Sequence, residues 1–231
     1  MRVLAVAIFT LLLVVPVLNG CRGDERLLKN LAKSDIDFVA DAHQREMNRL
    51  MQSLLLKLYK RNPRELEKSA VASLEQRQRQ IFATPGRLAF AELDNRQGTA
   101  ALELAFAPDF TGDRVFAIMV GVVTMVRSSY NWQEEQFLLD SLDPQTLFDS
   151  ARNLEILAWR LSNRRDAQGN LLLLTNSRPG EEENLSFERH FGKMIAVQEL
   201  LAFTLAGKVD RGISRVLQGA VSSAAFLPMG F

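Results

Sequence analysis

Apolar side chains recur at helical spacing along most of the chain, and the first clear case follows Asp35. The apolar residues of this segment are Ile36, Val39, Met47, Leu50, Met51, Leu54 and Leu58. Their spacings of three, four and seven or eight residues are those expected for one face of a helix. We predict a long helix here, capped by Ser34 or Asp35. Asn62-Pro63 should end it and begin a second helix over about 63–82, because Asn caps helices and Pro suits the first helical position.

The most apolar stretch after the N-terminal segment is 115–126, which only Gly121 and Thr124 interrupt. It is too short to cross a bilayer, which takes about 20 residues. We therefore predict a buried central helix over 113–129. Gly lowers helix stability by about 1 kcal/mol relative to Ala, so its presence predicts that another helix approaches closely at this position.

Three more helices are predicted in the second half of the chain. Asp143-Pro144 supplies a cap and a first-turn residue for a helix to about residue 163, and apolar periodicity indicates others over 186–206 and about 210–226. The polar loop before the second of these contains four leucines at 171–174. Two interpretations of these four leucines stay open: a short strand, or a hydrophobic plug that inserts into the body.

Residues 87–107 allow two interpretations. Their arms, 87–93 and 99–107, flank a polar loop and could form either a β-hairpin or two short helices. Ala and Leu dominate both arms and β-branched residues are nearly absent, which favours helices.

The pattern as a whole predicts a mainly α fold, with a single helical-bundle-like domain of about seven or eight helices over 35–231 and one short β-hairpin as the open alternative. No internal repeat or low-complexity linker divides this stretch. The apolar C-terminal residues 227–231 should dock on the body or on a partner.

The N-terminal segment has the features of an export signal. After Met1-Arg2, the stretch 3–18 is apolar except for Thr10 and Pro16. A transmembrane helix needs about 20 apolar residues, and Pro16, Asn19 and Gly20 end this run too early. We therefore predict a cleaved signal peptide over 1–20.

Leu18-Asn19-Gly20-Cys21 resembles the lipobox of bacterial lipoproteins, and the resemblance covers residues 1–21 only. It implies that the Cys21 thiol receives a diacylglyceryl group, that cleavage falls between Gly20 and Cys21, and that the new amine is acylated. Cys21 is the only cysteine, so the chain forms no internal disulfide, and lipidation explains this lone thiol. Residues 21–34 would then be the lipidated cysteine and its tether.

The same resemblance implies a location. In enteric bacteria an aspartate after the lipidated cysteine commonly retains lipoproteins in the inner membrane, and here Arg22 follows Cys21. The expected place is therefore the outer membrane, facing the periplasm, with inner-membrane anchoring as the alternative. Each buried methylene contributes about 0.8 kcal/mol, so two or three acyl chains would make the membrane a permanent partner.

Composition narrows the partners further. Hydrophobic residues make up 47% and charged residues 24% of the 231, proportions that exclude wholesale disorder. Lys and Arg number 28 against 27 Asp and Glu, so a net charge of +1 gives no broad attraction for nucleic acid. Lipid, rather than surface charge, should hold this chain to its membrane.

The residues available for acid-base or metal chemistry are few, because the chain has only two histidines. Glu46 follows His43 by one helical turn, and His190 is the other imidazole. Their spacing matches neither His-Glu-x-x-His nor the Glu-x-x-His pairs of di-iron bundles. We interpret His43 as a core or interface residue and predict no metal or other cofactor; a metal site built from His43, Glu46 and His190 is the alternative.

No catalytic residue is assigned. The chain lacks Gly-x-Ser-x-Gly and a phosphate-binding glycine loop, and Cys21 would be consumed by lipid. The Gln- and Arg-rich segment 76–80 is interpreted as a solvated face, with peptidoglycan or partner contact as the alternative. Trp132 and Trp159 are interpreted as packing anchors.

These observations favour a non-catalytic lipoprotein that binds or scaffolds another component of the cell envelope, such as an envelope protein. One alternative is a periplasmic metal-assisted hydrolase that uses His43 and His190. A second is a helical carrier of apolar ligands, whose cavity would be lined by residues 115–126.

Overall fold

The computed structural model describes residues 35–71, 73–134, 142–177, 180–209 and 225–229. Within them the chain is mainly helical, as predicted, and its only β pairing is an isolated bridge between Arg165 and Leu171. The elements are α3 (Asp35–Arg61), α4 (Pro63–Glu67), α5 (Leu74–Phe82), the 3-10 turn η2 (Ala91–Leu93), α6 (Gly98–Phe106), α7 (Arg114–Ser129), α8 (Pro144–Asn163) and α9 (Ser186–Val209).

The predicted signal peptide, Cys21 with its tether, and nearly all of the helix predicted over 210–226 lie outside the described residues. No helix in the described ranges combines the length and hydrophobicity needed to cross a membrane.

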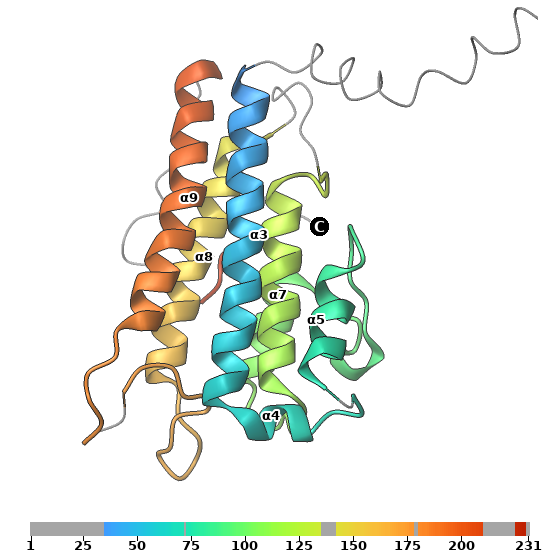
Figure 1. Cartoon of the computed structure of the whole chain (residues 1–231), viewed down its shortest axis with the longest axis vertical. Coiled ribbons are helices and arrows are strands. Elements are labelled where there is room, and N and C mark those ends of the chain that lie inside the picture. The colour runs from blue at the N-terminus through green and yellow to red at the C-terminus, as the bar shows by residue number, and fades with distance from the viewer. Residues whose placement is uncertain (1–34, 72, 135–141, 178–179, 210–224, 230–231) are drawn as a thin grey trace, which may run out of the picture.

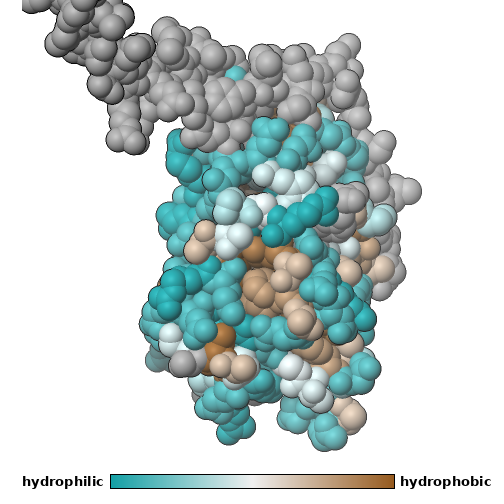
Figure 2. All heavy atoms as spheres, turned by 90° about the vertical axis from the view of Figure 1, so that its right-hand side faces the viewer, coloured by the Kyte–Doolittle hydropathy of each residue, from teal (hydrophilic) through white to brown (hydrophobic). Residues whose placement is uncertain are grey.

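Four long helices, α3, α7, α8 and α9, run side by side and form the body of the molecule (Figure 1). α9 packs against α8 and α3, and α6 packs against α7. α4 and α5 follow α3 and flank α7. On the side that carries α5, apolar surface gathers in the middle and hydrophilic side chains surround it (Figure 2).

α7 is the centre of the core, as predicted for 113–129. Every residue of this helix except Arg127 is buried. A Cβ added at Gly121 would lie 2.7 Å from Leu102 Cγ and 2.9 Å from the carbonyl oxygen of Gly98, so α6 does approach α7 closely here. The Thr124 hydroxyl accepts a hydrogen bond from the Gly98 amide (2.7 Å) and thereby joins the two helices.

A buried charge cluster holds the start of α7. Asp113 caps the helix by accepting the Phe116 amide (2.9 Å), and its other oxygen accepts the Tyr59 hydroxyl of α3 (2.6 Å). That oxygen also lies 3.5 Å from Nε of Arg77 on α5. The Arg77 guanidinium stacks 3.7 Å from the centre of the Phe116 ring and donates two hydrogen bonds to Glu92 (2.6 and 2.7 Å).

Arg77 corrects the interpretation of 76–80 as a solvated face, because its side chain is 0% exposed. The helix predicted over 63–82 is also divided in two. The Ser69 hydroxyl donates to the Leu66 carbonyl (2.7 Å) after α4, and Ser73 caps α5 by accepting the Gln76 amide (3.3 Å). Serine side chains of this kind offer the backbone an alternative to continuing the helix.

The structure also decides between the alternatives that the sequence left open for residues 87–107 and 171–174. In 87–107 the second arm forms α6, whereas the first holds only η2, and left-handed Asp94 and Asn95 (φ 52° and 57°) turn the chain between them. The hairpin is therefore not formed. Among the four leucines at 171–174, Leu173 is buried and acts as the hydrophobic plug.

Of the C-terminal residues 227–231, which we predicted to dock on the body or on a partner, residues 227–229 are described and lie on the body, whereas 230–231 lie outside the described residues. The Asn153 side chain accepts the Leu227 amide (2.6 Å) and donates to the Leu227 carbonyl (3.0 Å). Met229 is buried in the core cluster.

Gly121→Ala should lower the free energy of unfolding by about 1–3 kcal/mol, because the methyl group overpacks the contact with α6 by more than the gain in helix propensity. Gly207→Ala is the matched control on α9. A Cβ there would meet no atom within 4 Å, so this change should raise the stability by up to about 1 kcal/mol. Chemical denaturation measures both; equal effects would contradict the close approach at Gly121.

Asp113 should make the stability depend on pH. Burial raises the pKa of its carboxyl from 3.8 to about 6, against the opposing effects of Tyr59, the Phe116 amide and Arg77. Because the folded-state pKa lies above the unfolded one, the protonated form favours folding, and this contribution is lost as pH rises from about 4 to about 6.

Asp113→Asn removes this titration and keeps a good helix-capping residue. Its free energy of unfolding relative to that of the wild type should therefore rise by about 3 kcal/mol between about pH 3.5 and pH 7. Urea denaturation at several pH values measures the difference. A difference that stays constant over this range would show that Asp113 does not titrate as described.

Candidate functional site

The two histidines lie on the seam between α3 and α9 but do not meet. His43 Nδ1 is 3.1 Å from the Val197 carbonyl oxygen, and His190 Nε2 is 2.8 Å from that of Leu50. The two bonds are therefore seven residues apart on each helix, which corresponds to about 10 Å along the axis. Each imidazole joins one helix to the backbone of the other.

Glu46, the third residue of the alternative metal site, is paired with Arg49. The Glu46 carboxylate accepts two hydrogen bonds from Arg49 (2.5 and 2.7 Å), which lower its pKa. Burial lowers the pKa of His190. Within the described residues, no group of three or more His, Cys, Asp or Glu side chains is placed to hold a metal ion.

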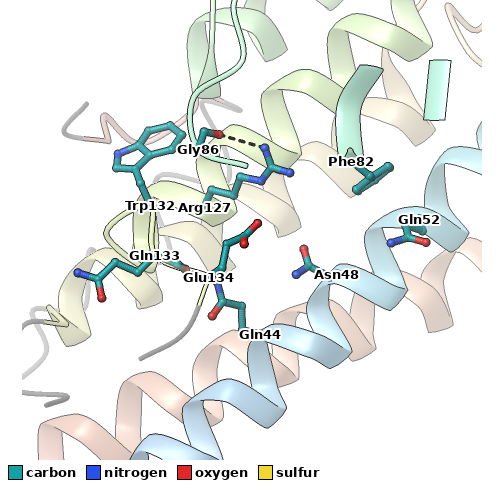
Figure 3. A pocket seen from close by; sticks show the side chains of 9 residues that line it. All are labelled: Gln44, Asn48, Gln52, Phe82, Gly86, Arg127, Trp132, Gln133 and Glu134. Atoms are coloured by element: carbon teal, nitrogen blue, oxygen red, sulfur yellow. Dashed lines mark hydrogen bonds between the residues drawn. The ribbon is translucent and has the colours of Figure 1, made fainter. Parts of the chain in front are cut away.

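A small polar pocket lies between α3, the end of α5 and the segment that follows α7 (Figure 3). Its volume is about 120 Å³. Three side-chain amides from α3 form one wall, and we call it the amide pocket. The described residues that line it are Gln44, Asn48, Gln52, Phe82, Gly86, Arg127, Trp132, Gln133 and Glu134.

The α3 wall consists of Gln44, Asn48 and Gln52, whose spacing of four residues places them one above another on the helix. Gln44 is 7% exposed, and its Nε2 donates to the Gln133 carbonyl (2.5 Å). This bond fixes the orientation of the amide. Its Oε1 is buried and accepts no hydrogen bond within the described part of the chain.

The row of α3 amides is the most informative feature of the pocket. The amides of Asn48 and Gln52 project from the same helix toward the space in front of Phe82 and Arg127 (Figure 3). Together they offer both donors and acceptors to a group that enters.

Arg127 holds the opposite wall in place. Its guanidinium donates to the carbonyl groups of Thr84 (2.9 Å), Gly86 (3.0 Å) and Ile81 (3.2 Å), and thus binds the end of α5 to α7. Burial lowers its pKa and nearby Glu134 acts against this. Because its donors are engaged with the backbone, we assign Arg127 the role of positioning the wall.

The chain leaves α7 through an unusual turn that completes the pocket. Asn131 and Trp132 both have left-handed backbone conformations (φ 54° and 63°), which are costly for residues other than Gly. The Trp132 amide donates back to the Arg127 carbonyl (2.8 Å), and the guanidinium of Arg87 lies 4.7 Å from the Trp132 ring. The turn directs the Gln133 carbonyl toward α3, where it accepts a hydrogen bond from Gln44.

The lining favours binding of a small, uncharged polar group. One water molecule takes about 30 Å³, so the pocket has room for about four waters or for one polar substituent of a larger ligand. Glu134 and Arg127 are the only ionisable groups in the described lining, and Arg127 is engaged. The geometry thus provides hydrogen bonds and two aromatic side chains, those of Phe82 and Trp132.

None of the three α3 amides is among the site residues expected from the sequence. Their repeat at every fourth position was the available signal, but it did not show what lies opposite them. Trp132, which we interpreted as a packing anchor, lines the pocket, and Trp159 is 41% exposed on α8.

Comparisons with protein-family models, with curated proteins and with solved structures find no match for this chain. Its function is therefore inferred from its own residues and their geometry.

Proposed function

We propose that the protein is a non-catalytic, lipid-anchored component of the bacterial cell envelope that binds another envelope component through the amide pocket. Residues 1–21 support the anchor, since their pattern resembles that of bacterial lipoproteins. Arg22 favours the outer membrane, facing the periplasm, over the inner membrane. The three side-chain amides that α3 places along one wall of the pocket, those of Gln44, Asn48 and Gln52, are the observation that carries the binding role.

The chemistry of the pocket favours an acetamido group as the part of the ligand that enters. Such a group has one N–H to donate to the side-chain oxygen of Asn48 or Gln52 and one carbonyl to accept from the side-chain nitrogen of the other. Its methyl group suits the apolar wall formed by Phe82. Acetamido groups recur along N-acetylated amino-sugar chains, so we infer that the ligand is the glycan of peptidoglycan.

The anchor is tested by replacing the cysteine that would carry it. Cys21→Ala should abolish incorporation of labelled fatty acid and change the electrophoretic mobility, because acylation needs the thiol and cleavage follows acylation. Ser34→Ala is a control that keeps the lipobox and should leave both unchanged. Fatty acid that is still incorporated into Cys21→Ala, with unchanged mobility, would contradict the lipid anchor.

The pocket is tested by removing its two partly exposed amides. Asn48→Ala combined with Gln52→Ala should weaken binding of soluble peptidoglycan fragments about 5- to 100-fold, the effect of losing two hydrogen bonds of ordinary strength. Isothermal titration calorimetry with the full chain in detergent measures the affinity.

Two controls make this test specific. Gln168→Ala removes an exposed amide from the loop after α8 and should leave binding unchanged. Fragments whose amino sugars have been de-N-acetylated should bind the wild-type protein no better than they bind the double variant. Equal binding of acetylated and deacetylated fragments by the wild type would contradict the acetamido assignment without bearing on the anchor.

A further inference from the structure

The outer face of α9 is apolar where a solvent-facing helix is usually polar. Leu200 is 60% exposed and Phe203 is 45% exposed. Ala196 is exposed one turn before Leu200 on the same face. The Phe203 ring touches Phe148 of α8 at one edge, with the ring centres 6.0 Å apart, so it stands at the border between the two helices.

A groove lies further along the same border. It has a volume of about 430 Å³, and its apolar lining comes from both helices: Ala158 and Trp159 of α8, and Phe191, Gly192 and Ile195 of α9. Gly192 is exposed, and a Cβ there would meet no atom within 4 Å. The groove therefore has space for an apolar side chain from outside.

The protruding side chains and the groove occupy opposite halves of one helix. Phe203 follows Gly192 by 203 − 192 = 11 residues, or about 16 Å along the axis. If two α9 helices pack antiparallel about a twofold axis, Phe203 of each copy faces Gly192 and the groove of the other. In the same register Leu200 faces Ile195 of the other copy and lies next to its small Ala196.

We propose that two copies of this chain form a twofold symmetric dimer through the α8–α9 face, with Phe203 of each inserted into the groove beside Trp159 of the other. A twofold interface uses one surface patch twice, so it requires a patch that is complementary to itself. The α9 face meets this requirement when the helices are antiparallel. Parallel packing would instead place Phe203 on Phe203 and leave both grooves empty.

This arrangement does not depend on the proposed lipid anchor, but it is compatible with it. The hydrogen bonds of His43 to Val197 and of His190 to Leu50 set the register of α3 against α9. In this register residue 35 is level with residue 205. The start of α3 in each copy then lies about 11 Å from the twofold axis, and the two starts are about 22 Å apart along the helices. The 35 − 21 = 14 residues that follow Cys21 can reach about 46 Å, which is enough for both copies to share one membrane.

Position-specific cross-linking tests the register without disturbing the proposed contacts. In a full-length Cys21→Ser background, Lys193→Cys is made in one tagged copy and Thr204→Cys in a copy with a different tag. Both sites are exposed beside the apolar face, and they are about 16 Å apart within one chain, too far for an internal disulfide. Mild oxidation should give a disulfide between the two tags. Predominant 193–193 or 204–204 products, or no cross-link, would overturn the proposed arrangement.

Mass measurement tests the contacts themselves. Leu200→Glu should raise the dimer dissociation constant at least about tenfold in sedimentation equilibrium, because it buries a charge against the partner's Ile195 and Ala196. Leu56→Glu is the matched control, since Leu56 is 44% exposed but lies on α3. It should leave the dimer intact, and circular dichroism should show both variants folded. An unsubstituted chain that sediments as a monomer, or equal effects of the two changes, would overturn the proposal.

Discussion

The fold depends on one constraint, which is that α7 is surrounded by protein along almost its whole length. A buried helix must still satisfy the amide groups of its first turn, and Asp113 does so by accepting the Phe116 amide. This brings a carboxylate into the core, where an unpaired charge would cost several kcal/mol. The Tyr59 hydroxyl and the Arg77 guanidinium meet this need, and they come from α3 and α5. The cap of one helix thus fixes the places of two others.

The other end of α7 shapes the amide pocket by the same logic. Arg127 is the one residue of α7 outside the buried set, and it donates to three carbonyl groups around the end of α5. The left-handed turn at Asn131 and Trp132 then returns the chain toward α3. The wall opposite α3 is therefore held by the ends of α5 and α7, which the hydrogen bonds of Arg127 join, and this is a rigid setting for a binding site.

The two surfaces that we assign to binding have different physical characters. The amide pocket offers hydrogen-bonding groups and room for one small substituent, which suits selection of a chemical group more than high affinity. The α9 face offers apolar side chains and an apolar groove. A dimer formed there would carry two amide pockets, and two pockets on one repeating polymer bind more tightly than either alone. Two lipid anchors would likewise hold such a dimer to the membrane more firmly than one.

Local chemistry in the sequence determined the helices and several of their ends. Asp113 and Asp143 cap α7 and α8 through their own side chains, and Gly121 marks a close helix approach because no other residue leaves that space. These features could be predicted since each depends on residues within a few positions of one another. The break between α4 and α5 is also local, but the serines that make it are common in loops and helices alike.

The tertiary structure alone decided which faces meet, and therefore which polar residues are buried. Arg77 lies among other Arg and Gln residues, and only the approach of Asp113, Glu92 and Phe116 makes it a core residue. His43 and His190 could not be separated by sequence, because their distance follows from the register of α3 against α9. Gln44 is an ordinary helix residue until the turn after α7 covers it. Periodicity and caps are properties of one segment, whereas burial and pockets are properties of the contacts between segments far apart in the chain.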